Sequence, residues 1–361
     1  MKVFVTGATG FVGSRLVPAL LEAGHEVTVL TRDATRYGGP SEVHVIEGDL
    51  LSPGEFRLVD RANETGTDDG DGTANSNAPE RTETLGGILS SLGIEAAYYL
   101  VHSMGAGEDF ETKDRTAART FARGLSEAGV GRVIYLGGLG VESDRLSPHL
   151  RSRREVERIL REGEAALTTL RAAIVIGAGS ASFELIRQLS SRLPVMVTPR
   201  WVETPCQPIA VDDVVAYLVG VLDVPGTTGE TYEIGGPEVL TYREIMRRTG
   251  RQLGQEPYIV SVPVLTPRLS AYWLDLVTDV PRGVAHPLIE GLKNPVVATD
   301  TRIRDLVAVD LTPFDVAVAR ALGNDPDRPV TVEVREPTGT GTGSESEPGM
   351  ESESEAGTGA R

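Results

Sequence analysis

The chain has 361 residues, with 52 acidic and 35 basic side chains and a formal net charge of −17. This charge disfavours a nucleic acid as partner, because binding to phosphates requires a basic surface. The length allows one large or two modest domains, and the single cysteine, Cys206, excludes an internal disulfide or a cysteine metal cluster.

The first 13 residues, MKVFVTGATGFVG, predict a buried strand followed by a glycine-rich turn. Residues 2–6 form an apolar, β-branched run typical of a strand covered on both faces. Gly7, Gly10 and Gly13 lead into residues 14–22, whose apolar side chains have helical spacing. In a dinucleotide site these glycines allow a tight turn, approach of the backbone to the pyrophosphate, and close packing of helix on strand. The motif therefore predicts dinucleotide binding; a turn without a ligand is the alternative.

Strands and helices then alternate, which predicts an α/β fold with a Rossmann-type, doubly wound parallel sheet. Further strands are expected at residues 27–31, 43–47, 96–101, 131–136, 167–171, 194–198 and 231–234. Helices are expected at residues 85–92, 108–128, 150–161, 183–193, 212–222 and 241–253, and Thr241-Tyr-Arg-Glu244 forms a capping box at the start of the last.

The domain boundaries follow from composition. Residues 59–84 are too polar to bury a core, which predicts a disordered acidic insertion, and residues 326–361 predict a disordered acidic tail. We expect a nucleotide-binding domain over residues 1–240, which includes a lobe segment at about 178–210. A smaller, discontinuous C-terminal lobe for a substrate or partner is expected over residues 241–325.

These features resemble the extended and atypical branch of the short-chain dehydrogenase/reductase superfamily. The resemblance consists of TGATGFVG at 6–13, Gly48-Asp-Leu50, and Thr168-Thr-Leu-Arg171 leading to Gly177. Tyr98-Tyr-Leu-Val-His-Ser-Met104 is more specifically similar to NmrA-like NAD(P)H-binding proteins, which are often described as predicted nucleoside-diphosphate-sugar epimerases. The accessory NAD(P)H-binding subunit of respiratory complex I is similar too.

The resemblance implies a set of residues that hold the dinucleotide. They are Gly7, Thr9, Gly10, Phe11, Val12, Gly13, Thr31, Arg32, Asp49, Leu50, Leu100, Val101, His102 and Arg153. Asp49 would accept a hydrogen bond from the adenine amino group. At the end of the second strand an acidic residue would bind the ribose of NAD, but Thr31-Arg32 stands there, and a guanidinium suits the 2′-phosphate of NADP. We expect NADP; pairing of Arg32 with Asp33, or a purely surface role of Arg32, would leave NAD as the cofactor.

The catalytic positions of the superfamily are changed in this chain. Its reductases use Tyr-x-x-x-Lys on one helical face together with an upstream Ser or Thr. Glu157, which typically follows the lysine by four residues, fixes the register and places Arg153 at the lysine position and His149 at the tyrosine position. The serine position falls within Leu136-Gly-Gly-Leu-Gly140, which contains no hydroxyl.

His149 is a candidate proton donor, since an imidazole titrates near neutral pH, and His102 is a second candidate. A solvent-facing histidine at a helix start and a loop histidine beside the cofactor are the respective alternatives. Cys206 is expected to pack in the interior rather than to act as a nucleophile. No metal site is expected.

Two functions follow from the changed positions. A non-catalytic NAD(P)(H)-binding protein, which senses redox state or stabilises a complex with a protein partner, is favoured by the loss of Tyr, Lys and Ser. The alternative is an NADP(H)-dependent oxidoreductase or epimerase-like enzyme that uses His149 or His102. Its substrate would be small and apolar (quinone-like) or nucleotide-linked, and the apolar residues 262–280 could wall the pocket.

The basic residues are almost all arginine, since lysine occurs only at Lys2, Lys113 and Lys293. An acidic surface poor in lysine predicts a halophilic source; an acidic mesophilic protein is the alternative. The sequence shows no signal peptide and no run of 18 apolar residues, so we expect a cytoplasmic protein without a transmembrane segment.

Overall fold

The computed structural model describes residues 1–59, 83–103, 109–140, 148–262, 279 and 291–323. The expected insertion lies outside these residues except at its ends, and the expected tail lies outside them entirely. Apart from Val262 and Asp279, the apolar segment expected to wall a pocket also lies outside the described residues.

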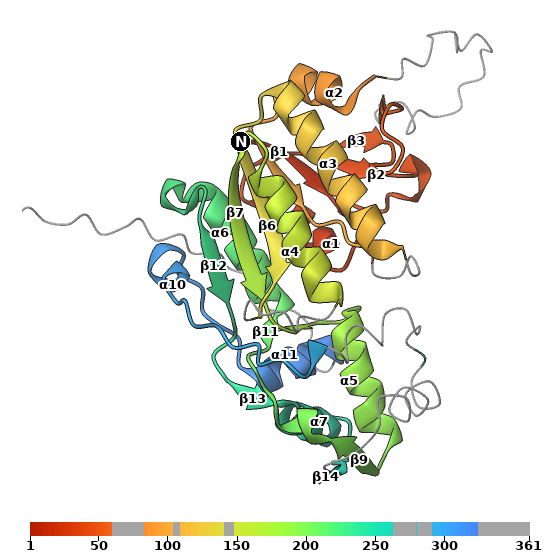
Figure 1. Ribbon diagram of the computed structural model, residues 1–361, viewed down its shortest axis with the longest axis vertical. Coiled ribbons are helices and arrows are strands. Elements are labelled where there is room, and N and C mark those ends of the chain that lie inside the picture. The colour runs from red at the N-terminus through yellow and green to blue at the C-terminus, as the bar shows by residue number, and fades with distance from the viewer. Residues whose placement is uncertain (60–82, 104–108, 141–147, 263–278, 280–290, 324–361) are drawn as a thin grey trace, which may run out of the picture.

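An eight-stranded sheet with the order β12-β7-β6-β5-β1-β2-β3-β4 forms the centre of the molecule (Figure 1). Its strands are β1 Lys2–Thr6, β2 Glu26–Thr31, β3 His44–Glu47, β4 Arg57–Val59, β5 Ala96–Tyr99, β6 Arg132–Gly138, β7 Ala166–Ala172 and β12 Thr231–Ile234. Every neighbouring pair is parallel except β3 and β4. The strand order reverses between β1 and β5, which makes their carboxyl ends the topological switch point of the sheet. The predicted doubly wound α/β fold is confirmed.

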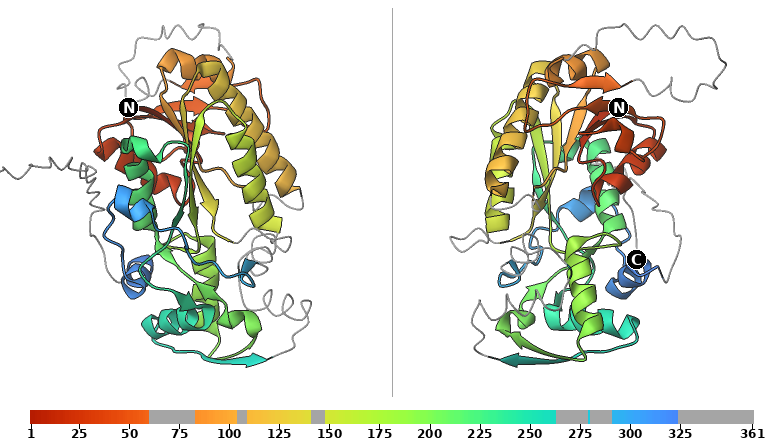
Figure 2. Two further views of the ribbon diagram at one scale, coloured as in Figure 1. Left: turned by 60° about the vertical axis from the view of Figure 1, so that its left-hand side comes forward. Right: turned by 90° about the vertical axis from the view of Figure 1, so that its right-hand side faces the viewer.

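Helices cover both faces of this sheet (Figure 2). One face carries α1 Gly13–Glu22 and α6 Val211–Asp223, and the other carries α2 Leu85–Leu92, α3 Phe110–Ala128 and α4 Pro148–Arg161. Local sequence sets the helix ends: the Thr84 hydroxyl caps α2, while Gly93 and Gly129 end α2 and α3 in the left-handed conformation. Within the described ranges, no helix is both long and apolar enough to cross a membrane.

A separate group of elements lies beyond the carboxyl ends of β6 and β7 (Figure 1). Their buried side chains form a second hydrophobic core. Its elements are α5 Ala181–Arg192, α7 Tyr242–Gln252, α11 Phe314–Ala321, and the strand pairs β9 Val195–Pro199 with β14 Tyr258–Val262, β10 Pro205–Cys206 with β13 Leu240–Thr241, and β8 Val175–Ile176 with β11 Ile209–Ala210. The described residues also form the short helices η1 Ala34–Arg36, η3 Arg200–Glu203, η4 Pro225–Thr227 and α10 Ile303–Leu306. The predicted capping box at the start of α7 is confirmed. The lobe segments come from both sides of residue 240, and the proposed domain division rests on this separate core.

Two element boundaries differ from the sequence-based expectation. The polar insertion is shorter at both ends, because Val59 belongs to β4, Glu83 pairs with Phe56 through backbone hydrogen bonds, and Thr84 caps α2. The strand expected to reach residue 101 ends at Tyr99, so residues 100–103 form a loop at the switch point.

Candidate functional site

A large crevice opens at the carboxyl ends of β1, β2, β3 and β5, with a cavity volume of about 960 Å³. Ten of the residues predicted to hold the dinucleotide line it together: Gly7, Thr9, Gly10, Thr31, Arg32, Asp49, Leu50, Leu100, Val101 and His102. They come from four different loops, which the parallel strands bring to one edge of the sheet. The crevice lies at the switch point, where doubly wound sheets bind their ligands.

The glycine turn has the close backbone contacts that a pyrophosphate site requires. Gly7 has a φ of 74°, and a Cβ atom on it would lie 2.8 Å from the carbonyl of Leu100. Gly13 is buried beneath the turn as the first residue of α1, and its Cβ would lie 2.2 Å from the carbonyl oxygen of Gly7. The Gly10 N–H donates to that same oxygen at 2.9 Å. Only glycine fits at both ends of this turn, and α1 begins next to the crevice, so the turn fits the phosphates of a dinucleotide.

The part of the crevice beside the end of β2, where the sequence predicts the adenosine of the cofactor, has two guanidinium groups. Arg32 is exposed, lines the crevice, and forms no ion pair within the described part of the chain. Asp33 does not pair with it: its carboxylate accepts hydrogen bonds from Thr35 and lies 3.3 Å from Arg36. Arg36 also lines the crevice and was not found from the sequence. Asp49 accepts a hydrogen bond from the Leu51 N–H through Oδ1 at 2.9 Å.

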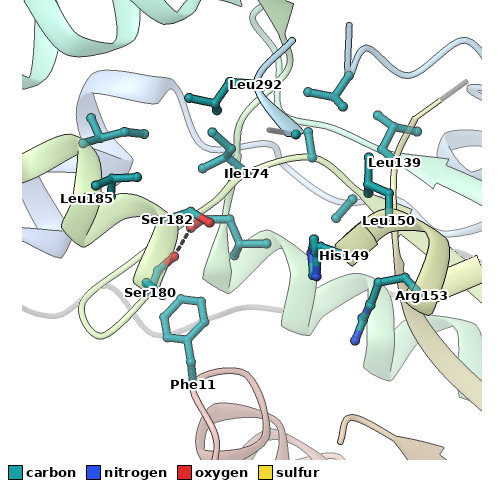
Figure 3. A pocket seen from close by; sticks show the side chains of 18 of the residues that line it. Phe11, Leu139, His149, Leu150, Arg153, Ile174, Ser180, Ser182, Leu185 and Leu292 are labelled. Atoms are coloured by element: carbon teal, nitrogen blue, oxygen red, sulfur yellow. Dashed lines mark hydrogen bonds between the residues drawn. The ribbon is translucent and has the colours of Figure 1, made fainter. Parts of the chain in front are cut away.

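A second cavity of about 380 Å³ lies between the carboxyl ends of β6 and β7 and the second core (Figure 3). Its lining is largely apolar and includes Leu139, Leu150, Ile174, Leu185, Ile186 and Leu292. Three residues expected at the dinucleotide, Phe11, Val12 and Arg153, line this apolar cavity and are absent from the lining of the crevice. Leu100 and His102 line both cavities, so the two spaces share a wall at the switch point.

The two candidate histidines are in direct contact beside this wall. His102 Nε2 lies 3.1 Å from His149 Nδ1, and His102 Nδ1 lies 3.0 Å from a carboxylate oxygen of Asp114. Asp114, on α3, is 1% exposed and also accepts hydrogen bonds of 2.8 Å from the Ser103 N–H and from the Ser152 hydroxyl. These contacts form a hydrogen-bond chain that runs from Asp114 through His102 to His149. The sequence identified the two histidines but not Asp114.

The electrostatics of this chain keep the carboxyl ionised and the imidazoles neutral. Burial by itself would raise the pKa of Asp114, but hydrogen bonds from His102, Ser152 and Ser103 outweigh it and lower this pKa to about 2. Burial, the neighbouring His102 and the charge of Arg153 lower the pKa of His149 to about 3. The pKa of His102 is also lowered, chiefly by burial, although Asp114 opposes that shift.

Arg153 lines the apolar cavity and not the crevice. Its guanidinium donates to the carbonyl of Leu136 and lies 5.1 Å from the centre of the Tyr135 ring. In turn, the Tyr135 hydroxyl donates to the Arg153 carbonyl at 3.0 Å, and burial raises the pKa of this phenol to about 12. Cys206 is buried in the second core, where burial raises the pKa of its thiol to about 12, as expected of a packing residue.

One sequence signal could have identified Asp114. It lies on the apolar stripe of its helix, four residues after Phe110, three before Ala117 and seven before Phe121, all of them buried. An acidic residue on a buried helical stripe needs partners, because an unpaired buried carboxylate is costly. Its partners come from the β5 loop and from α4, and no local pattern links those segments to α3.

The parallel sheet, the glycine turn and the crevice at the switch point define a protein of the dinucleotide-binding Rossmann class. Residues 3–63 match the family described as "NAD dependent epimerase/dehydratase family". The structure of UDP-glucuronic acid 4-epimerase from Bacillus cereus, solved with UDP-glucuronic acid and NAD, superimposes with a TM-score of 0.59 over 90% of this chain and 98% of that one, at 16% identity. This likeness concerns the fold.

Two curated relatives are similar over much more of the chain than residues 3–63. The ceramide reductase of Caulobacter vibrioides is 26% identical over 72% of this chain and 73% of its own length. NADH dehydrogenase [ubiquinone] 1 alpha subcomplex subunit 9 of Dictyostelium discoideum is 26% identical over 67% of this chain and 61% of its own length, so the chain spans less than two thirds of that protein. The resemblance to extended short-chain dehydrogenases/reductases and to the complex I subunit is confirmed.

Proposed function

We propose that the protein is a nicotinamide-dinucleotide-dependent oxidoreductase that reduces, or forms by oxidation, an apolar carbonyl compound or quinone held in the second cavity. The observation that carries the proposal is the shared wall. His102 and Leu100 border both the dinucleotide crevice and a closely adjoining apolar cavity, as a reaction between a cofactor and an apolar substrate requires. The match to an NAD-dependent family and a relative named as a reductase support it.

The residues of the crevice suit the parts of the cofactor. The glycine turn and the start of α1 would hold the pyrophosphate, Asp49 the adenine, and Leu100 with Val101 the nicotinamide side. When bound, the cofactor supplies or accepts the hydride. The chain contributes orientation, an apolar enclosure for the substrate, and the histidine pair at the shared wall, which can take up or release a proton. We therefore favour the enzyme alternative over the non-catalytic one. His149, at the position of the family's tyrosine, lines the apolar cavity and is hydrogen-bonded to His102.

Fluorescence titration with NADPH and NADH, followed by turnover assays with 2-decanone and decylubiquinone, tests the proposal. We expect binding of at least one nucleotide and nucleotide oxidation that depends on the apolar acceptor. Absence of nucleotide binding would refute dinucleotide dependence. Binding without turnover of any apolar carbonyl or quinone would favour the non-catalytic function.

NADP(H) is proposed as the preferred cofactor because Arg32 and Arg36 both line the adenosine end of the crevice. Arg32→Asp should raise the Kd for NADPH about ten- to a hundredfold, since a charge-assisted hydrogen bond to phosphate contributes about 1.5–3 kcal/mol. The Kd for NADH should change less. Arg119→Asp, at an exposed position of α3 outside the crevice lining, is the matched control. Equal effects on both nucleotides would refute the preference.

The second candidate function is a nucleotide binder that stabilises a protein complex. The specific observation is an apolar strip formed by Val195 and Val197 of β9 and Tyr258 and Val260 of β14, which lie opposite one another in the parallel pair. Val195 is 57% and Tyr258 71% exposed. Large exposed apolar side chains grouped on one face are typical of interaction surfaces, and one relative is a complex I subunit by name.

A further inference from the structure

The hydrogen-bond chain at the shared wall fixes which nitrogen atoms carry protons. Asp114 is ionised and only accepts hydrogen bonds, so the proton between it and His102 is on His102 Nδ1. In a neutral imidazole the other nitrogen is then a bare acceptor, so His102 Nε2 accepts the Nδ1 proton of His149. By the same rule, neutral His149 carries no proton on Nε2.

The free nitrogen of His149 is placed to meet a substrate. His149 lines the apolar cavity from the first turn of α4 (Figure 3). Its Nε2 has no hydrogen-bond partner among the residues that the structure describes. A partly exposed acceptor that no group of the described residues satisfies, in an otherwise apolar cavity, marks the place where a polar group of a ligand would bind.

We propose that Asp114, His102 and His149 form a proton relay in which His149 Nε2 is the general base or acid toward the hydroxyl or carbonyl group of an otherwise apolar substrate. This inference rests on the proposed function and assigns its substrate class as a secondary alcohol and the corresponding ketone. In the oxidative direction the hydroxyl proton moves to His149 Nε2, and the carbinol hydrogen leaves with two electrons as hydride to the cofactor. The C–O single bond becomes a carbonyl, and reduction reverses each transfer.

The relay moves the new positive charge away from the apolar cavity. Once His149 Nε2 is protonated, the Nδ1 proton of His149 can pass to His102 Nε2, which leaves His149 neutral again. The imidazolium then lies on His102, 3.0 Å from the carboxylate of Asp114, and His102 also borders the crevice. The charge of Arg153 on α4 disfavours the cation at both histidines, whereas Asp114 on α3 favours it. Asp114 and His102 are thus positioning and relay residues, and His149 is the group that touches substrate.

The tautomers can be measured without any turnover. Nitrogen-15 NMR of the histidine rings at pH 7.5 should show His102 and His149 both protonated at Nδ1 and bare at Nε2. Asp114→Asn should reverse both, because the Ser103 N–H holds the amide oxygen and turns the amide NH₂ toward His102. A proton on His149 Nε2 in the wild-type protein at this pH would overturn the relay.

Kinetics then test the role of the base. With 2-decanol and the preferred oxidised nucleotide, His149→Gln should lower kcat at least a hundredfold and leave the Kd of the nucleotide unchanged. His44→Gln, at a half-exposed histidine on β3, is the matched control and should leave kcat unchanged. Asp114→Asn should lower kcat about ten- to a hundredfold and alter its pH profile, and Asp114→Glu should recover part of the rate.

The outcomes separate the two proposals. If the wild type oxidises 2-decanol and His149→Gln changes kcat by less than threefold, the relay is overturned and the oxidoreductase function is retained. No wild-type turnover with any apolar alcohol, ketone or quinone would overturn the oxidoreductase and the catalytic relay together. In that case the NMR measurement would still decide whether the hydrogen-bond chain itself exists.

Discussion

Gly13→Ala should lower the free energy of unfolding by about 3 kcal/mol and abolish nucleotide binding. The added Cβ would lie 2.2 Å from the Gly7 carbonyl oxygen and 2.8 Å from the Ala8 Cα. Both neighbours are backbone atoms of the turn, so no side chain can rotate to relieve the overlap, and α1 must move away from β1 as a unit. Overpacking of this kind costs about 1–3 kcal/mol and sometimes more. The same movement separates the turn from the start of the helix, and the phosphates lose their site.

Urea denaturation measures the first effect and titration with NADPH and NADH the second. Gly131→Ala is the matched control, because its φ is not positive and nothing lies within 4 Å of the added Cβ. We expect the control to change the free energy of unfolding by less than about 0.5 kcal/mol. An unchanged denaturation midpoint together with an unchanged Kd in Gly13→Ala would contradict the assignment of this glycine as the packing position of the motif.

The fold was predictable from the sequence because its signals are local. β1 is an apolar run, β12 alternates buried and partly exposed residues, and α2 lies between a threonine cap and Gly93. Parallel strands buried on both faces and helices with one apolar face produce such patterns over short segments. β4 was not predicted, because it has only three residues and directly precedes the polar insertion. Its antiparallel pairing with β3 depends on the tertiary structure.

The site was predictable only in part. Residues that follow strands, such as Asp49 and His102, reach one crevice because parallel strands place their carboxyl ends at one edge. The apolar cavity depends on the position of the second core over β6 and β7, so the sequence did not reveal that Phe11 and Arg153, which it assigns to the cofactor, also line a separate cavity. Asp114 was missed for the same reason: its partners come from other elements of the fold.

Asp114→Ala should lower the free energy of unfolding by about 3 kcal/mol at pH 7. The carboxylate is buried and accepts hydrogen bonds from His102, Ser152 and the Ser103 N–H, so its removal leaves three donors without their acceptor. The lowered pKa of this carboxyl reflects the same hydrogen bonds and leads to a similar figure. A pKa of about 2 in the folded chain, against an ordinary value of 3.8, corresponds to about 2.4 kcal/mol.

The sign of the pH dependence follows from the lowered pKa. Between about pH 4 and pH 2 the folded protein keeps this carboxyl ionised, whereas the unfolded chain binds a proton. The contribution of the ionised carboxyl to the free energy of unfolding is therefore complete above about pH 4 and is lost as the pH falls toward 2. The difference in free energy of unfolding between wild type and Asp114→Ala, measured by urea denaturation, should therefore shrink by roughly 1 kcal/mol between pH 7 and pH 3. Asp310→Ala, at an exposed carboxylate, is the matched control. If this difference in free energy of unfolding stays constant down to pH 3, Asp114 stabilises the fold through packing alone. The argument that an ionised Asp114 sets the proton positions of the two histidines would then fail.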